Sequence, residues 1–279
     1  MKIQDLFLRY FRTRLKLLAL FSKQQAGIKA FQIFCTPYFT TSYDVKQMHN
    51  ATRLSLKFEG PSITGHQWNE GGAQKLLIAH GFRSASANFK HFAEKLSAKG
   101  YEVLAFDAPA HGLSEGKTIN ALVYRNFIHA INEQYGPFDA YLAHSFGGLA
   151  VSLHLEELPE NTHIKTVLIA PAANTQQLCE DFFRQMRIKD QAVQQHFYDK
   201  IRHLSNKDIE WFSINRAAAC IKGPVLWVHD TGDKVTPIDD ALQLQQKQLP
   251  NFHFLFTDNL GHRRIYRDEN VVSAVVDFL

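Results

Sequence analysis

A serine in the stretch AHSFGG, Ser145, stands between an apolar run and a pair of glycines. A serine hydroxyl attacks a carbonyl carbon only when a base removes its proton and an acid orients that base. A sharp turn between a strand and a helix exposes such a serine, and it requires small residues two positions away on either side. Ala143 and Gly147 meet this requirement, and Gly148 lets the following helix approach. The sequence therefore predicts that Ser145 is a nucleophile.

The candidate acid and base follow Ser145 in the chain, each in a loop after an apolar run. Asp233 lies on a turn in HDTGDKVTP, and His262 lies in a later loop that contains a glycine. Nucleophile, acid and base occur in this chain order when the nucleophile sits on such a turn. Asp230 is the rival acid, although its position at the end of the strand favours a role in bracing the turn. We expect a Ser145–His262–Asp233 relay that transfers an acyl group through a covalent intermediate.

Acyl transfer places negative charge on the carbonyl oxygen, and fixed N–H donors stabilise that charge. One donor is expected to be the backbone amide of Phe146, directly after the nucleophile. The second is expected to be the amide of Phe82 in the segment HGFR, where Gly81 lets the backbone approach the substrate. Side chains near these two turns are candidates for the substrate pocket: His80, Gly81, His111 and His144.

Short apolar runs, separated by helix-like segments, must position these residues. The runs cover residues 75–80, 102–107, 139–144, 165–171, 224–229 and 252–257. Such strands, alternating with helices, predict a parallel sheet that is covered on both faces. Helices are expected over residues 87–99, 122–135, 148–157, 238–248 and 270–279.

Two further segments complete the predicted architecture. Arg53–Glu59 and Ser62–Asn69 alternate polar and apolar residues around Gly60-Pro61, which indicates an antiparallel hairpin. An insertion at about residues 172–218 has a helical period and no strand. Ligands of parallel α/β sheets bind beyond the carboxyl ends of the strands, so this insertion is expected to be a lid.

Together these segments resemble the α/β-hydrolase superfamily, from about residue 53 to residue 279, and within it a poorly characterised bacterial branch of serine hydrolases. The motifs that carry the resemblance are HGF, FDAPAHGLSEG, AHSFGG, HDTGDKVTP and GHRR. The chain has Ala143 for the first glycine of G-x-S-x-G and Ala110 for a glycine of D-x-P-G-x-G-x-S. The resemblance implies a mostly parallel central sheet with an antiparallel N-terminal hairpin, helices on both faces and a helical cap after the sixth strand. It implies the same nucleophile, acid, base and oxyanion donors as the residues themselves.

Composition narrows the class of protein. The net charge of +4 is spread over 279 residues, which argues against a nucleic-acid partner. The three cysteines lie far apart without a C-x-x-C pair, so neither a zinc site nor a disulfide framework is predicted, and a reducing, cytoplasmic location is expected. A relay of this kind needs no metal or organic cofactor, and its partner is expected to be a small-molecule acyl substrate.

Residues 1–50 are expected to be a helical extension packed on a hydrolase domain of residues 51–279. Met1–Phe34 has the pattern of one or two amphipathic helices ending before Pro37. Arginines and lysines break up its apolar positions, so that the longest clean run, Leu17–Phe21, is short. A signal peptide or a membrane span is therefore not predicted. Packing on the body of the protein is the expected arrangement, and a basic helix on a membrane surface is the alternative.

The expected function is hydrolysis of a carboxylic ester or a similar acyl compound. The same fold carries other acyl-transfer chemistry, so a thioesterase, a peptidase and an acyltransferase are alternatives, as is a binding protein without activity. A dehalogenase is disfavoured, because its nucleophile would be an aspartate at the position of Ser145.

Overall fold

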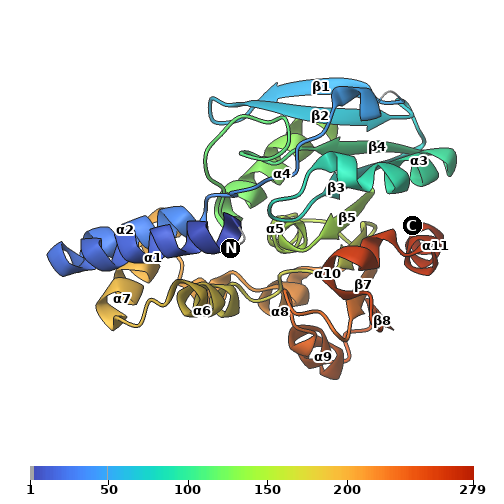
Figure 1. Ribbon diagram of the computed structural model, residues 1–279. Coiled ribbons are helices and arrows are strands. Elements are labelled where there is room, and N and C mark those ends of the chain that lie inside the picture. Colours follow the sequence, from blue (N-terminus) through green and yellow to red (C-terminus); the bar gives the residue numbers. More distant parts are fainter. Residues whose placement is uncertain (1–2, 49) are drawn as a thin grey trace. The chain divides into compact units, whose positions relative to one another are not determined.

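The computed structural model of the chain describes residues 3–48 and 50–279 (Figure 1). Its contacts divide the chain into two compact units. One, here called the helical unit, combines Met1–Thr36 with Asn174–Ser213. The other, here called the sheet unit, combines Pro37–Ala173 with Ile214–Leu279.

Eight strands of the described residues form the single sheet of the sheet unit, in the order β1-β2-β4-β3-β5-β6-β7-β8. The strands are β1 (Thr52–Lys57), β2 (Ser62–Trp68), β3 (Gln74–Ala79), β4 (Tyr101–Phe106), β5 (Ala140–His144), β6 (Lys165–Ile169), β7 (Val225–Asp230) and β8 (Phe252–Thr257). Strand β2 pairs antiparallel with β1 and β4, and the remaining neighbours are parallel. The predicted α/β-hydrolase fold, with its N-terminal hairpin and its six later strands, is confirmed.

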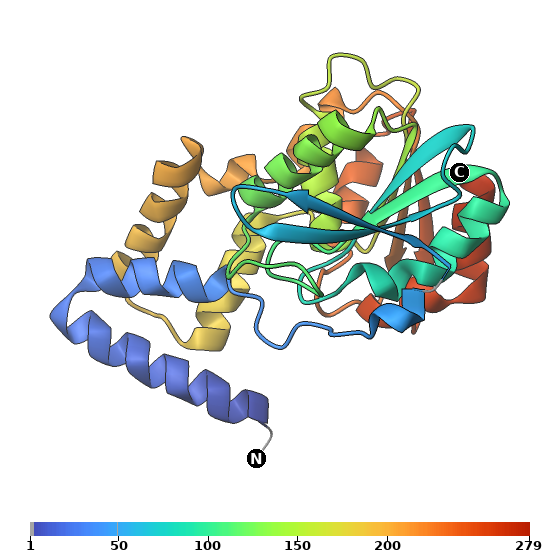
Figure 2. The same ribbon diagram turned by 90° about the horizontal axis from the view of Figure 1, so that it is seen from above.

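Helices cover both faces of this sheet (Figure 2). Helices α3 (Lys90–Ala98) and α11 (Glu269–Phe278) lie together on one face. The other face carries α4 (Ala121–Tyr135), α5 (Phe146–Leu155), α8 (Ile214–Ala217) and α9 (Asp239–Gln246). Shorter elements are α10 (Gly261–Arg264) and the 3₁₀ turns η1 (Val45–Met48), η2 (Ser86–Phe89), η3 (Ile209–Trp211), η4 (Ala218–Cys220) and η5 (Ile265–Arg267).

The central strands are buried on both faces because their side chains are almost all apolar. Every residue of β4 and β5 is buried. Leu76, Ile78 and Val103 pack on the side of α3 and α11, where they contact a core that includes Phe92 and Val275. This packing fixes the carboxyl ends of the parallel strands, and the loops that carry Ser145, Asp233 and His262 leave the sheet there.

The helical unit contains α1 (Ile3–Phe21), α2 (Lys23–Phe34), α6 (Thr175–Met186) and α7 (Gln191–Ser205). Helix α2 packs along α7, and aromatic rings fill the space between the helices: Phe31, Phe34, Phe182, Phe183 and Phe197. Lys23 and Asp190 form an ion pair across this contact. In the part of the chain that the structure describes, every helix is too short or too polar to cross a bilayer.

The helical unit thus joins the two segments that the sequence predicts as an extension (residues 1–50) and as a lid (about 172–218). Residues 37–50 belong instead to the sheet unit. The insertion leaves the sheet unit between β6 and β7, where the amide of Ile214 donates to the carbonyl of Ala173 at 2.9 Å. The lid role of the insertion stays a prediction.

Candidate active site

Ser145 occupies the sharp turn between β5 and α5. Its backbone has φ 53° and ψ −120°. Residues other than glycine rarely adopt this conformation, which costs about 1–3 kcal/mol in backbone strain. Two backbone hydrogen bonds hold the turn. The N–H of Ser145 donates to the carbonyl of Ile169 at 3.1 Å, and the N–H of Ala172 donates to the carbonyl of Ser145 at 2.9 Å. The neighbouring strand therefore fixes the strained conformation that the sequence predicts.

Glycines next to the turn are required by close backbone contacts. A Cβ atom on Gly147 would lie 2.3 Å from the carbonyl oxygen of Ala79. A Cβ atom on Gly81 would lie 2.9 Å from the Cβ atom of Ser145. Both approaches are shorter than atoms tolerate, so any larger residue would move the loop after β3 away from the serine.

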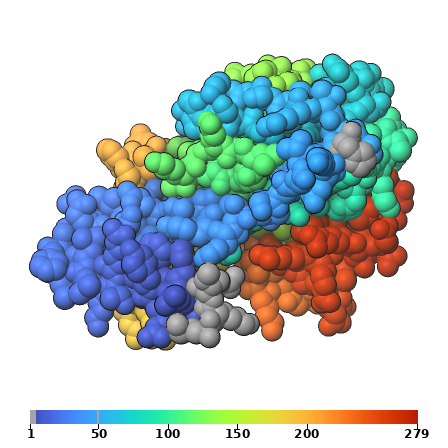
Figure 3. Space-filling view, turned by 45° about the horizontal axis from the view of Figure 1, so that its top comes forward, coloured from blue at the N-terminus to red at the C-terminus, as the bar shows by residue number. Residues whose placement is uncertain are grey.

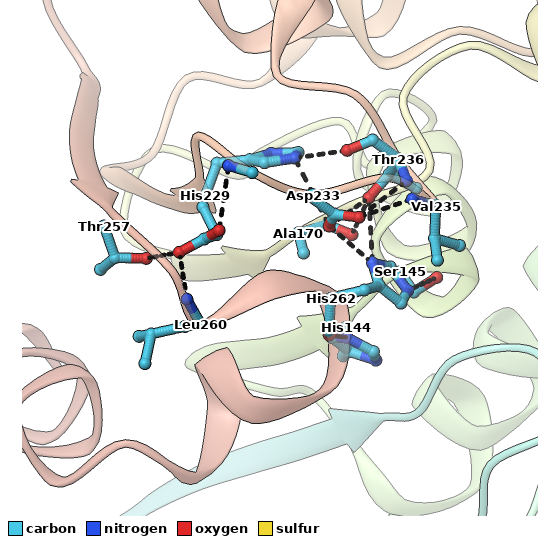
Figure 4. Close-up of polar contacts among 12 residues, drawn as sticks. His144, Ser145, Ala170, His229, Asp233, Val235, Thr236, Thr257, Leu260 and His262 are labelled. Atoms are coloured by element: carbon cyan, nitrogen blue, oxygen red, sulfur yellow. Dashed lines mark hydrogen bonds and ion pairs between the residues drawn. The ribbon is translucent and has the colours of Figure 1, made fainter.

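The three side chains of the predicted relay lie in hydrogen-bonding contact (Figure 4). His262 Nε2 is 3.0 Å from Ser145 Oγ, and His262 Nδ1 is 2.7 Å from Asp233 Oδ2. A carboxylate only accepts hydrogen bonds, so Nδ1 carries the proton and Nε2 presents a lone pair to the serine O–H. The structure thus brings together residues from three loops in the order that a proton relay needs.

Thr236 is a member of this cluster that the sequence analysis did not identify. Its Oγ1 lies 2.9 Å from Asp233 Oδ2 and 3.1 Å from His262 Nδ1. The backbone amides of Val235 and Thr236 donate to Asp233 Oδ1 at 2.7 and 3.1 Å. An aspartate on a turn indicates that its side chain bonds the backbone amides two or three residues later, but no sequence signal indicates the contact of Thr236 with His262.

Asp233 is held as a carboxylate. Burial alone raises its pKa, but the hydrogen bond and charge of His262 and the amides of Val235 and Thr236 outweigh burial, so the pKa lies below the ordinary value. The side chain is fully buried, which keeps water from competing for these bonds. A fixed negative charge beside Nδ1 would stabilise the imidazolium that forms when Nε2 takes a proton.

Asp230, the rival acid, braces the turn instead. Its Oδ2 accepts from the amide of Leu260 at 2.9 Å and from the hydroxyl of Thr257 at 3.0 Å, and its Oδ1 accepts from the amide of Gly232 at 3.0 Å. These bonds tie the end of β7 to the loop that carries His262 (Figure 4). Asp230 therefore positions the loop of His262 through the backbone of Leu260.

His144 also holds the loop that carries His262. Its Nε2–H donates to the backbone carbonyl of His262 at 3.0 Å, and its ring lies 4.7 Å from that of Tyr266. Burial, followed by the nearby His262, lowers the pKa of His144 to about 3. The ring is thus neutral at physiological pH and packs beneath the nucleophile turn.

The predicted oxyanion donors lie on neighbouring turns. The rings of Phe82 and Phe146 meet edge to face with centroids 5.8 Å apart. Phe146 opens α5, and the first amides of a helix have no carbonyl partner within it. Phe82 directly follows Gly81, whose backbone lies close to the side chain of Ser145. The amide of Phe146 is therefore available at the turn that carries the serine, and its role as an oxyanion donor, like that of Phe82, stays a prediction.

His80 and His111, two predicted pocket residues, are buried and tie the loop after β3 to the loop after β4. His80 Nδ1 bonds the Gly81 carbonyl at 2.8 Å, and its Nε2 accepts from Ala108 N–H at 2.9 Å. His111 Nε2 accepts from Arg83 N–H at 2.9 Å. Burial, with a smaller contribution from His80, lowers the pKa of His111 to about 3, which keeps this nitrogen an acceptor.

Such contacts position the loop after β3, while contact of His80, Gly81, His111 or His144 with substrate stays a prediction. Within residues 3–48 and 50–279, no group of three or more His, Cys, Asp or Glu side chains is arranged to hold a metal ion.

Comparison with known proteins places the chain among hydrolases. A family model described as serine aminopeptidase, S33, matches residues 72–219, just over half of the chain. Esterase Pf2001 of Pyrococcus furiosus has 19% identity and a TM-score of 0.64, over 88% of this chain and 95% of the esterase.

Two further solved structures are similar in fold. Mouse alpha/beta hydrolase domain-containing protein 10 has 16% identity and a TM-score of 0.61, over 81% of this chain and 96% of the mouse chain. A bacterial membrane phospholipase A, described as a virulence factor, has 15% identity and a TM-score of 0.63, over 97% of each chain. At these identities the likeness concerns the fold alone.

Proposed function

The chain belongs to the serine aminopeptidase, S33, family of the α/β-hydrolase superfamily, and on that premise we propose that it hydrolyses a carboxylic ester or a similar acyl substrate through Ser145, His262 and Asp233. The observation that carries the proposal is the unbroken hydrogen-bonded chain from Ser145 Oγ through His262 to Asp233. Without it, a buried serine hydroxyl would be a poor nucleophile.

In the first half of the proposed cycle, Ser145 Oγ attacks the carbonyl carbon while its proton passes to His262 Nε2. The negative charge that forms on the carbonyl oxygen is held by the backbone amides of Phe82 and Phe146. Asp233 keeps the imidazolium oriented. The C–O bond to the leaving group then breaks as Nε2–H protonates the departing alkoxide, which leaves the acyl group on Ser145.

In the second half, water takes the place of the leaving alcohol. His262 Nε2 removes a proton from this water, whose oxygen attacks the acyl carbon, and the oxyanion again forms at the same amides. The bond to Ser145 Oγ breaks when Nε2 returns the proton to the serine. The products are one alcohol and one carboxylic acid, and the protein returns to its starting protonation state.

The decisive experiment compares wild type with Ser145→Ala on short p-nitrophenyl esters, together with labelling by a fluorophosphonate probe. We expect the variant to lose both turnover and labelling, with kcat reduced by about 10⁵-fold or more. Ser97→Ala, in α3 and far along the chain from the relay, is the matched control and should keep both. Unchanged ester turnover by Ser145→Ala would rule out the assignment.

A panel of acyl esters, thioesters and amides separates the alternatives on this scaffold. Preference for esters, by kcat/KM, supports the proposed reaction, whereas preference for thioesters or amides replaces it with thioesterase or peptidase activity at the same serine. A protein that binds ligands without catalysis would neither turn over any of these substrates nor react with the probe.

A further inference from the structure

One face of α1 exposes a stripe of large apolar side chains. We call this set the outer stripe: Leu6, Tyr10, Leu17, Leu20 and Phe21, with exposed fractions of 56%, 56%, 54%, 72% and 88%. Leu6, Tyr10, Leu17 and Leu20 are four, seven and three residues apart, and Phe21 directly follows Leu20. At about 3.6 residues per turn, this places all five on one side of the helix. An open groove runs along the same face between residues 6 and 17. Side chains of this size are seldom left so exposed in a row, so the stripe indicates a binding surface.

The opposite face of α1 is already anchored within the helical unit. Phe11 and Leu15 are 8% and 4% exposed. The guanidinium of Arg12 donates to the backbone carbonyl of Gln185 in α6, with Nε at 2.9 Å and Nη2 at 2.6 Å. The helix therefore has a fixed inner face and presents its outer stripe on the surface, where α1 appears in dark blue in Figure 3.

Cations border the outer stripe on both edges. By helical spacing Arg9 and Lys16 lie along one edge of the stripe and Arg14 lies along the other. All three side chains are exposed. Asp5 is the one acidic side chain that α1 contains within the described part of the chain. An apolar centre with positive edges is complementary to a surface that offers hydrocarbon below a layer of anionic groups.

From this complementarity we propose that α1 lies in the plane of an anionic lipid membrane. The outer stripe enters the acyl-chain boundary, and Arg9, Arg14 and Lys16 contact lipid phosphates. The helix is not of the length and apolarity that a span requires, so it lies on the bilayer. Tyr10 carries a hydroxyl on an aromatic ring, which suits the boundary between headgroups and chains.

A second copy of the chain is a poorer occupant of the same face. Two such helices packed stripe to stripe would set the arginines and lysine of one copy beside those of the other. Like charges side by side oppose such a pairing, whereas they add to the attraction of an anionic membrane. The charge pattern therefore favours lipid over self-association.

The test is flotation of the full-length protein with vesicles of phosphatidylcholine and phosphatidylglycerol, against vesicles of phosphatidylcholine alone. We expect the protein to bind the anionic vesicles about tenfold or more tightly than the neutral ones. Added salt should weaken binding to the anionic vesicles. Leu17→Gln with Leu20→Gln, and separately Arg14→Gln with Lys16→Gln, should each lower anionic binding about tenfold.

Matched controls change exposed residues of the same kind that lie outside α1 in the chain. Leu204→Gln with Leu242→Gln, and Lys117→Gln with Lys189→Gln, should bind anionic vesicles as wild type does. Because all substituted side chains are exposed, every variant is expected to keep the unfolding midpoint of wild type, which thermal unfolding checks.

Three results would overturn the proposal. Wild type that floats with neither kind of vesicle removes it, as does equal flotation of wild type and the Leu17/Leu20 variant. A dimer in sedimentation velocity that the Leu17/Leu20 substitution dissociates, without any vesicle binding, would assign the stripe to a second copy of the chain. Ester turnover does not enter these readouts, so they stand apart from the proposed function.

Discussion

At the scale of single residues, Thr236 offers a sharp test of how the relay is held. Thr236→Val keeps the shape of the side chain but removes the hydroxyl that bonds Asp233 and touches His262. We expect kcat to fall about tenfold with KM unchanged, because the acid and base lose a fixed common partner. Thr236→Ser should restore most of the activity. If Thr236→Val and wild type have equal kcat, the hydroxyl has no positioning role.

The two candidate acids should respond differently to the same chemical change. Asp233→Asn puts an amide next to Nδ1, favours the wrong tautomer of His262 and should lower kcat by about 10³- to 10⁴-fold. Asp230→Asn weakens the bonds to Leu260 and Thr257 and should lower the free energy of unfolding by about 1–3 kcal/mol.

Steady-state kinetics and urea unfolding of both variants separate these effects. In Asp230→Asn we expect kcat to fall less than about tenfold, since its carboxylate acts on the base only through the loop backbone. A larger loss of kcat in Asp230→Asn than in Asp233→Asn would reverse the assignment of the acid.

That Ser145, Asp233 and His262 would lie close together was predictable from sequence, because each one follows an apolar strand. Parallel strands end at the same edge of a sheet, so three such loops bring Ser145, Asp233 and His262 together whatever the details of their turns. The contacts of Thr236 and His144 were not predictable. The bond from His144 to the carbonyl of His262 joins residues 118 positions apart, and no local pattern indicates such a contact.

At the scale of elements, the sheet could be predicted from the sequence, whereas the pairing of helices in the helical unit could not. A buried strand is visible as a local apolar run, and two alternating segments around Gly60-Pro61 are a local hairpin signal. The pairing of α2 with α7 joins segments about 170 residues apart through aromatic side chains. An amphipathic pattern indicates that a helix has a buried face, but it does not indicate which element packs on that face.

Gly27 tests this pairing of helices. A Cβ atom there would lie 2.6 Å from His196 Cβ and 2.7 Å from the Val193 carbonyl of α7. We expect Gly27→Ala to lower the free energy of unfolding by about 1–3 kcal/mol, although alanine is the better helix former. Gln24→Ala, exposed on the same helix, should be neutral or slightly stabilising in the same thermal unfolding assay. Stabilisation by Gly27→Ala would show that α2 does not approach α7 so closely.

At the scale of the whole molecule, the sheet unit buries histidines that stay neutral. Burial is the first cause that lowers the pKa to about 3 at His111, His144 and His154. An unfolded chain would protonate each of them near pH 6.5. Between these pH values the unfolded state binds more protons than the folded state, so the free energy of unfolding falls as the pH falls.

His154 allows this linkage to be measured away from the relay. It lies within α5, its Nε2 is 3.2 Å from the hydroxyl of Tyr141, and that hydroxyl keeps a second partner in Asn132. From pH 7.5 to about 5, each buried histidine should cost about 2 kcal/mol of stability. Urea unfolding at both pH values measures the free energy of unfolding that each variant loses between them. His154→Phe should lose about 2 kcal/mol less of it than wild type. His163→Gln, at an exposed position, should lose as much as wild type. Equal losses in the two variants would mean that His154 is protonated in the folded protein at pH 5, and that its burial does not make the fold sensitive to acid.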